Sequence, residues 1–88
     1  MPELSRFHGI VIRMYAEAGP HHSPHLHAYY GSSSAVVSLQ TGDVLAGGLP
    51  ARQRGLVEDW MRAHRAALDD NWRRLQSGES RRPIDPLP

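Results

Sequence analysis

Hydrophobic and polar residues alternate in the first half of the chain, as they do in half-buried β-strands. The run His8–Tyr15 is rich in β-branched and aromatic residues, which favours a strand. Because successive side chains of a strand point to opposite faces, Ile10, Ile12 and Met14 share one wholly apolar face. We expect that face to lie in the core and the face that carries Arg13 to be more exposed to solvent.

Three further segments repeat this alternation, at His25–Tyr30, Ala35–Gln40 and, as a short fourth strand, Val44–Gly47. Turn sequences rich in glycine and serine separate them. Pro24 restricts the preceding residue to extended conformations and so leads into the first of the three. The opening residues Met1–Phe7 are expected to form an irregular lead-in.

After Pro50 the pattern changes to a helical period. Apolar side chains and one histidine recur at steps of three and four residues, at Val57, Trp60, Met61, His64, Leu68, Trp72 and Leu75. Pro50 suits a first helical position, where its missing N–H costs nothing. Ser77-Gly78 is typical of a helix end. The sequence therefore predicts one helix from Pro50 to about Gln76.

These elements predict an α+β fold: an antiparallel three- to four-stranded β-meander with one long C-terminal helix packed on one face. We expect a single domain over residues 1–78 and an extended proline-rich tail over residues 79–88. One helix covers only one face of a sheet. The other face is then left to solvent, a ligand or a partner, and it carries Arg13, Tyr15, His25, His27 and Tyr29.

Composition narrows the class of protein. The 88 residues suffice for one hydrophobic core, and the absence of cysteine excludes disulfides and thiolate metal sites. No apolar run approaches the length of about 20 residues that a membrane span needs, and the N-terminus lacks the layout of a signal peptide. We therefore expect a cytoplasmic protein. A net charge of +1 does not indicate nucleic-acid binding, although arginine pairs can still hold phosphate locally.

Four of the six histidines lie close together, at positions 21, 22, 25 and 27. On a strand, His25 and His27 point the same way, with β-carbons roughly 6.5–7 Å apart. Two imidazoles at that spacing can bind one divalent transition metal (zinc, copper, nickel or iron), with His21, or His22 in its place, as a third ligand. No carboxylate lies between Glu17 and Asp43, so any acidic ligand would come from elsewhere.

Two other interpretations of the same residues stay open. In the first, His25 and His27 act with Arg13 and Tyr29 as the acid, base and phosphate-binding groups of a metal-independent RNase-like hydrolase. In the second, the rings stack with Tyr15 and Tyr29 on a surface that binds protein and carries no chemistry. The sequence does not decide whether the protein is an enzyme.

The residues of the second half are better explained by packing. His64 lies between Trp60 and Leu68 on the apolar helix stripe, which favours a half-buried ring that is bonded to a backbone carbonyl or to Tyr30. Trp60 and Trp72 are interpreted as core anchors.

Several separate motifs in register resemble a small bacterial family, the domain of unknown function DUF4160. The resemblance covers nearly the whole chain and rests on these segments: Met1–Phe7, Gly9–Ile12, Met14-Tyr15, Pro24–Ala28, Tyr30-Gly31, Thr41–Leu45, Gly47, Leu49-Pro50, Leu56-Val57, Trp60, His64-Arg65, Leu68, Asn71-Trp72, Pro83-Ile84 and Pro86-Leu87. The chain departs from the family pattern in the histidine loop, where Ser23 precedes Pro24 and His22 is extra. That departure bears on the rigidity of the loop and on any role of His21.

The resemblance implies no established activity. It does imply a gene context, because members are often encoded beside another small domain of unknown function in pairs discussed as toxin–antitoxin-like modules. The leading hypothesis is therefore an interaction component of a two-gene module, with a small protein partner encoded nearby or a second copy of itself on the uncovered face. A metal-binding protein or small metalloenzyme centred on His25 and His27 is the alternative.

Overall fold

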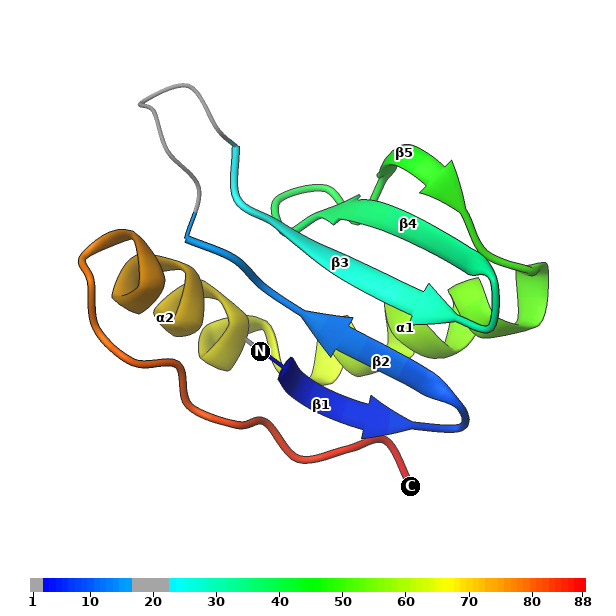
Figure 1. The fold of residues 1–88 in the computed structure, drawn as a ribbon. Helices are drawn as coiled ribbons and strands as arrows, with labels where there is room; N and C mark the ends of the chain where they lie inside the picture. The colour runs from blue at the N-terminus through cyan, green and yellow to red at the C-terminus, as the bar shows by residue number, and fades with distance from the viewer. Residues whose placement is uncertain (1–2, 17–22) are drawn as a thin grey trace.

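The computed structural model of the chain describes residues 3–16 and 23–88. It has the predicted α+β fold, an antiparallel sheet with helices packed against it (Figure 1). The sheet has five strands rather than three or four, and neighbours in the sheet are neighbours in the chain. Its strands are β1 (Glu3–Phe7), β2 (Ile10–Arg13), β3 (His25–Tyr30), β4 (Ser33–Ser38) and β5 (Val44–Gly48).

The extra strand is β1, which lies in the segment predicted to be irregular. A two-residue turn at His8-Gly9 joins it to β2, so that Phe7 pairs with Ile10. Both turn residues have positive φ, 49° at His8 and 78° at Gly9. That pair of left-handed residues is the geometry of a type I′ hairpin, which matches the twist of the flanking strands. The prediction began a strand at His8 and treated the residues before it as irregular, so it missed both β1 and the turn.

Alternation along the strands identified the core correctly. Ile10, Ile12 and Met14 are fully buried, as are Leu26 and Ala28 of β3. The packing partners on the helical side come from α1 (Ala51–Ala63) and α2 (Arg65–Gln76), and they include Val57, Trp60, Met61 and Leu68. The alternation identifies the buried face of each strand reliably, because a register shift of one residue would move every core side chain to the other face.

The predicted single helix is in fact two helices that meet at His64. His64 has non-helical angles (φ −123°, ψ 30°) and ends α1, while its carbonyl accepts from the amide of Leu68 in α2. A straight helix from Pro50 to Gln76 would measure about 40 Å at 1.5 Å per residue. The longest dimension of the molecule is 33 Å, so the change of direction keeps the whole helical segment against the sheet. No proline or internal glycine marks this break in the sequence.

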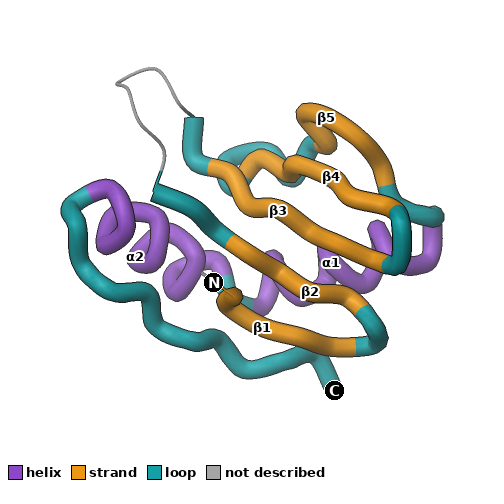
Figure 2. The backbone as a smooth tube through the Cα atoms, in the orientation of Figure 1, coloured by secondary structure: helices purple, strands orange, loops and turns teal. Residues whose placement is uncertain are grey.

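The C-terminal residues pack along the outer side of β1 (Figure 2). The amide of Ile84 donates to the carbonyl of Leu4 (2.8 Å), and the Ile84 side chain is buried. The indole Nε1 of Trp60 donates to the carbonyl of Asp85 (2.8 Å). Trp60 belongs to α1 and is fully buried against the sheet, so the bond to Asp85 brings the C-terminal residues over one end of the core.

Asn71 fastens the same segment to α2. Its side-chain oxygen accepts from the amide of Arg82 (2.7 Å), and its Nδ2 donates to the carbonyls of Arg82 and Ala67 (both 3.0 Å). Asn71 is almost completely buried. These hydrogen bonds matter for stability, because a buried polar group that loses its partner costs free energy.

Neither helix is long and apolar enough to cross a membrane, and the same holds for the whole part of the chain that the structure describes.

We predict that Asn71→Ala lowers the free energy of unfolding by about 1–3 kcal/mol, because it removes the hydrogen bonds that the buried Asn71 side chain forms with the amide and carbonyl of Arg82. Urea denaturation measures the loss. The exposed neighbour Asp69 provides the control, since Asp69→Ala should change stability by less than about 0.5 kcal/mol. Equal effects of the two substitutions would contradict the assigned role of Asn71.

Candidate functional site

The candidate site lies on the sheet face opposite the helices, here called the open face, which is toward the viewer in Figure 1. Strand register gives two lines of side chains across it. One line runs from β1 to β5 through Glu3, Arg13, His27, Val36 and Ala46. The parallel line runs through Arg6, Val11, Tyr29, Ser34 and Gly48.

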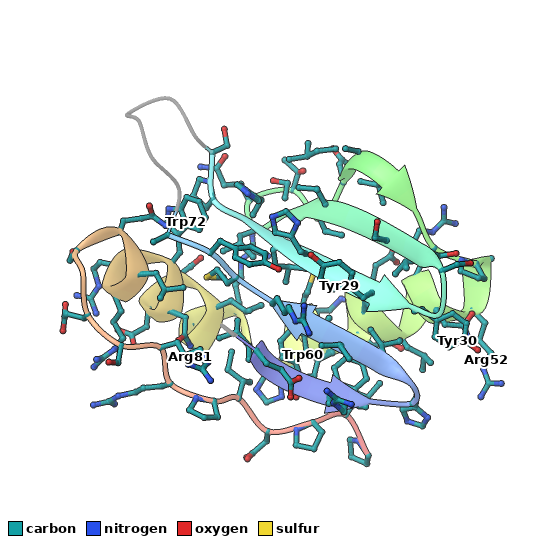
Figure 3. All side chains as sticks on the ribbon, in the orientation of Figure 1. Tyr29, Tyr30, Arg52, Trp60, Trp72 and Arg81 are labelled. Atoms are coloured by element: carbon teal, nitrogen blue, oxygen red, sulfur yellow. The ribbon has the colours of Figure 1, made fainter. Side chains whose placement is uncertain are left out.

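The structure brings the predicted site residues together on this face. Arg13 pairs with His27 across β2 and β3. Tyr29, which is labelled in Figure 3, lies two residues further along β3. His25 precedes them on the same strand, and its ring centroid is 5.3 Å from that of His27. Period-two alternation alone was enough to predict this grouping.

Five rings form a continuous series of contacts, here called the ring cluster: Tyr15, His25, His27, Tyr29 and Trp72. Tyr15 meets His27 edge-to-face at 4.8 Å, and His27 stacks on Tyr29 at 6.4 Å. Trp72 of α2 reaches His25 at 5.1 Å. Contacts of this kind hold aromatic side chains in fixed orientations, so the cluster is a preorganised surface.

The two tyrosines of the cluster share a hydrogen bond of 3.0 Å between their hydroxyl groups. This bond raises the pKa of Tyr29 above its ordinary value of 10.0, and partial burial adds to the effect. Arg13 acts in the opposite direction on the pKa through its charge, but more weakly. Tyr29 is therefore a neutral hydroxyl at physiological pH and donates or accepts hydrogen bonds without carrying charge.

Arg13 is the cation beside the cluster. Its guanidinium carbon lies 5.2 Å from the centroid of the Tyr29 ring, within the range of a cation–π contact. Its Nε is enclosed, and no acceptor within residues 3–16 and 23–88 reaches it. Arg6, by contrast, is paired with Glu3 at 2.9 Å. Among the residues that the structure describes, Arg13 is thus the arginine whose positive charge this face offers to a ligand or partner.

The ring of His25 is oriented by the backbone. His25 Nδ1 lies 2.7 Å from the carbonyl oxygen of Ser23. His21 and His22, the predicted third ligands, lie outside the described residues. Among the residues that the structure does describe, no group of three histidine, aspartate or glutamate side chains is placed to hold a metal ion.

Near β5 the open face is recessed, because the side chains that β4 and β5 present on this face are short. A hollow of about 120 Å³ lies at this step, between the rings of His27 and Tyr29 and the backbone at Ala46 and Gly47. Gly47 makes the close strand approach possible. It has a φ of 69°, and a β-carbon at this position would lie 2.2 Å from the carbonyl oxygen of Ser34. We call this low area, formed by Ser34, Val36, Ala46 and Gly48, the shelf.

The histidine and tryptophans of the helices have different positions. Trp60 is fully buried, which confirms it as a core anchor. His64 is half-buried and packs its ring against Trp60 at 5.6 Å, away from the open face. Trp72 was interpreted only as a core anchor, yet it is half-buried and contacts both the core and His25. Its second role depends on the helix break at His64, which the sequence pattern does not indicate.

A family model described as Domain of unknown function (DUF4160) matches residues 9–73. The matched segment contains the ring cluster and Arg13, whereas β1 and the C-terminal segment packed on it lie outside the match. Comparisons with curated proteins and with solved structures gave no match.

We predict that Tyr15→Phe lowers the pKa of Tyr29 toward 10.0, because it removes the hydroxyl that stabilises the neutral phenol. A pKa raised in the folded state contributes stability that is present below about pH 10 and is lost as the pH rises through the raised value. Titration of phenolate absorbance in the ultraviolet measures the shift. Tyr30→Phe, which alters the neighbouring tyrosine on the other face, is the control and should leave the Tyr29 pKa unchanged.

Proposed function

This chain belongs to the DUF4160 family, a domain of unknown function, and we propose that it is a protein-interaction component that binds a small protein partner on its open face. The observation that carries this proposal is one-sided coverage of the sheet. Both helices pack on the core face, and the C-terminal segment packs along β1. Within the described residues no element covers the opposite face.

The chemistry of the open face supports a protein ligand. Tyrosine, tryptophan and arginine are the residues most enriched at the energetic centres of protein interfaces. Here Tyr29 and Trp72 belong to the ring cluster, and Arg13 stacks on Tyr29. Mutual contacts fix these side chains before binding, which reduces the entropy lost on association. A partner that places a carboxylate over Arg13 would complete the hydrogen bonding of its guanidinium.

In finer terms, we propose that the partner is the small protein encoded beside this one and that the two form a toxin–antitoxin-like module. The gene context implied by the family resemblance supports this choice of partner. A net charge of only +1 favours a protein partner over a nucleic acid, and so does the small number of cations on the open face, where Arg13 is the one arginine of the described strands without an ion pair.

The test is binding between this protein and the product of the adjacent gene. Size-exclusion chromatography with light scattering should detect a complex, and calorimetry should show that Arg13→Ala weakens it by about 2 kcal/mol, the loss typical of an interface hot spot. Arg62→Ala is the matched control, because Arg62 is an exposed arginine on α1 whose ion pair with Asp59 is also exposed. Failure of the wild-type protein to bind, or equal effects of the two substitutions, would contradict the proposal.

A metal site centred on His25 and His27 is the second candidate function, and one observation favours it. The Ser23 carbonyl beside His25 Nδ1 is the kind of partner that orients a metal-ligating imidazole in proteins. The third ligand would be His21 or His22. Neutral imidazoles suit zinc, copper, nickel and iron, and protons compete with such metals for the rings.

Elemental analysis of protein prepared without an affinity tag tests this second candidate. If it holds, reconstitution brings one transition-metal ion per chain, and the double substitution His25→Ala with His27→Ala abolishes the uptake. The double substitution His8→Ala with His64→Ala removes two histidines from outside the cluster and should retain the metal. A metal content that stays substoichiometric after reconstitution would exclude the site.

A further inference from the structure

The two edges of the sheet differ in how they are protected. At β1 the chain covers its own edge: the amide of Ile84 bonds to Leu4, and the guanidinium of Arg81 donates to the carbonyl of Glu3 (2.7 Å). At β5 no other segment of the described chain forms a backbone hydrogen bond with the strand except its neighbour β4. One edge of the sheet is therefore closed and the other is open.

The open edge is hydrophobic and uncharged. All five residues of β5 are exposed, and none of them is charged or proline. The two exposed large hydrophobic side chains of the described chain are both here, Val44 at 37% and Leu45 at 55% exposure. Monomeric proteins usually protect such an edge with lysine, proline, a bulge or a covering segment, because it is a template for further strand pairing. Of these devices β5 has only the irregular register beside Val36 and Val37.

We propose that β5 pairs antiparallel with β5 of a second copy of this chain, so that the five strands of each copy form one continuous sheet. The pairing satisfies the outward backbone groups of both strands and covers Val44 and Leu45. It is an isologous contact, in which the same patch serves on both subunits. This interface is separate from the partner surface proposed above, which centres on β2 and β3.

Two properties of the chain favour a second copy as the occupant. First, β5 meets its own copy without like-charge repulsion, because the strand has no charged side chain and the net charge of the chain is only +1. Second, the sheet formed by the described residues has a single open edge, so the assembly closes after two copies instead of growing into a fibre. Since five residues bury little area compared with a standard interface, the dimer should be weak and depend on concentration.

The dimer would also enlarge the site. Joining the two shelves gives a floor of four neighbouring strands, about 14 Å across at the usual strand spacing. The rings of His27 and Tyr29 from each copy then stand on either side of this floor. A groove of that width accepts an α-helix, whose diameter is about 10–12 Å. This use of the groove, unlike the dimer itself, rests on the proposed function.

Light scattering over a range of protein concentrations tests the dimer with the protein alone. The apparent mass of the wild-type protein should rise from the monomer value of 9.8 kDa toward twice that value. Ala46→Lys, which places like charges close together at the two-fold axis, should raise the dissociation constant at least about tenfold. Ala66→Lys is the matched control, because Ala66 is an exposed alanine on α2, and this variant should dimerise like the wild type.

Hydrogen exchange locates the contact without relying on a variant. Amides of β5 should exchange more slowly in wild-type protein as the concentration rises, whereas those of β1 should not change. A mass that stays at the monomer value, or a dimer in which β5 exchange is unaffected, would overturn the proposal. Arg13→Ala should leave the dimer intact, so failure of partner binding and failure of dimerisation give different results.

Discussion

The burial of Trp60 is the constraint on which the rest of the structure depends. Its ring lies 5.4 Å from that of Phe7 in β1 and 5.6 Å from that of His64 at the helix break. Its indole nitrogen must have a hydrogen-bond acceptor, since a buried polar group without one is costly, and the carbonyl of Asp85 provides it. One side chain thus ties together the first strand, the helix break and the last residues of the chain.

This arrangement explains why the protein has two different faces. The helices and the C-terminal segment all converge on the side where Trp60 lies, and the hydrophobic residues of the strands follow them. The opposite face therefore carries side chains that are not part of the core, among them His25, His27, Tyr15, Tyr29 and Arg13. The open face is a candidate binding surface because the hydrophobic core lies entirely on the other side of the sheet.

Most of this division could be predicted from the sequence, because alternation along a strand directly reports which side chains share a face. It placed Ile10, Ile12 and Met14 in the core and grouped Arg13, His27 and Tyr29 on the opposite side. What could not be predicted depends on single backbone angles. The break at His64 interrupts an apolar pattern that continues on both sides of it, so periodicity passes over it. The turn at His8-Gly9 depends on two left-handed residues, and the segment before it was expected to be irregular.

The same reason limited the prediction of the site. Contacts within one strand follow from spacing, but the approach of Trp72 to His25 requires α2 to have its own direction. The docking of the C-terminal segment was also beyond the pattern, because a proline-rich stretch has no periodicity that reveals a partner. Asn71, which holds that stretch, was visible only as part of a family resemblance and not as a buried hydrogen-bonding residue.

The contact between Pro88 and the β1–β2 turn has a practical consequence for engineering. The carbonyl of Pro88 lies 2.9 Å from the ring nitrogen of His8, so the last residue sits beside the β1–β2 turn. A reporter or affinity label fused after Pro88 would leave the molecule at that corner, across the sheet from β5 (Figure 1). A label joined in front of β1 would instead start next to the residues that Arg81 and Ile84 hold in place. A label at the C-terminus therefore keeps away from the β5 edge.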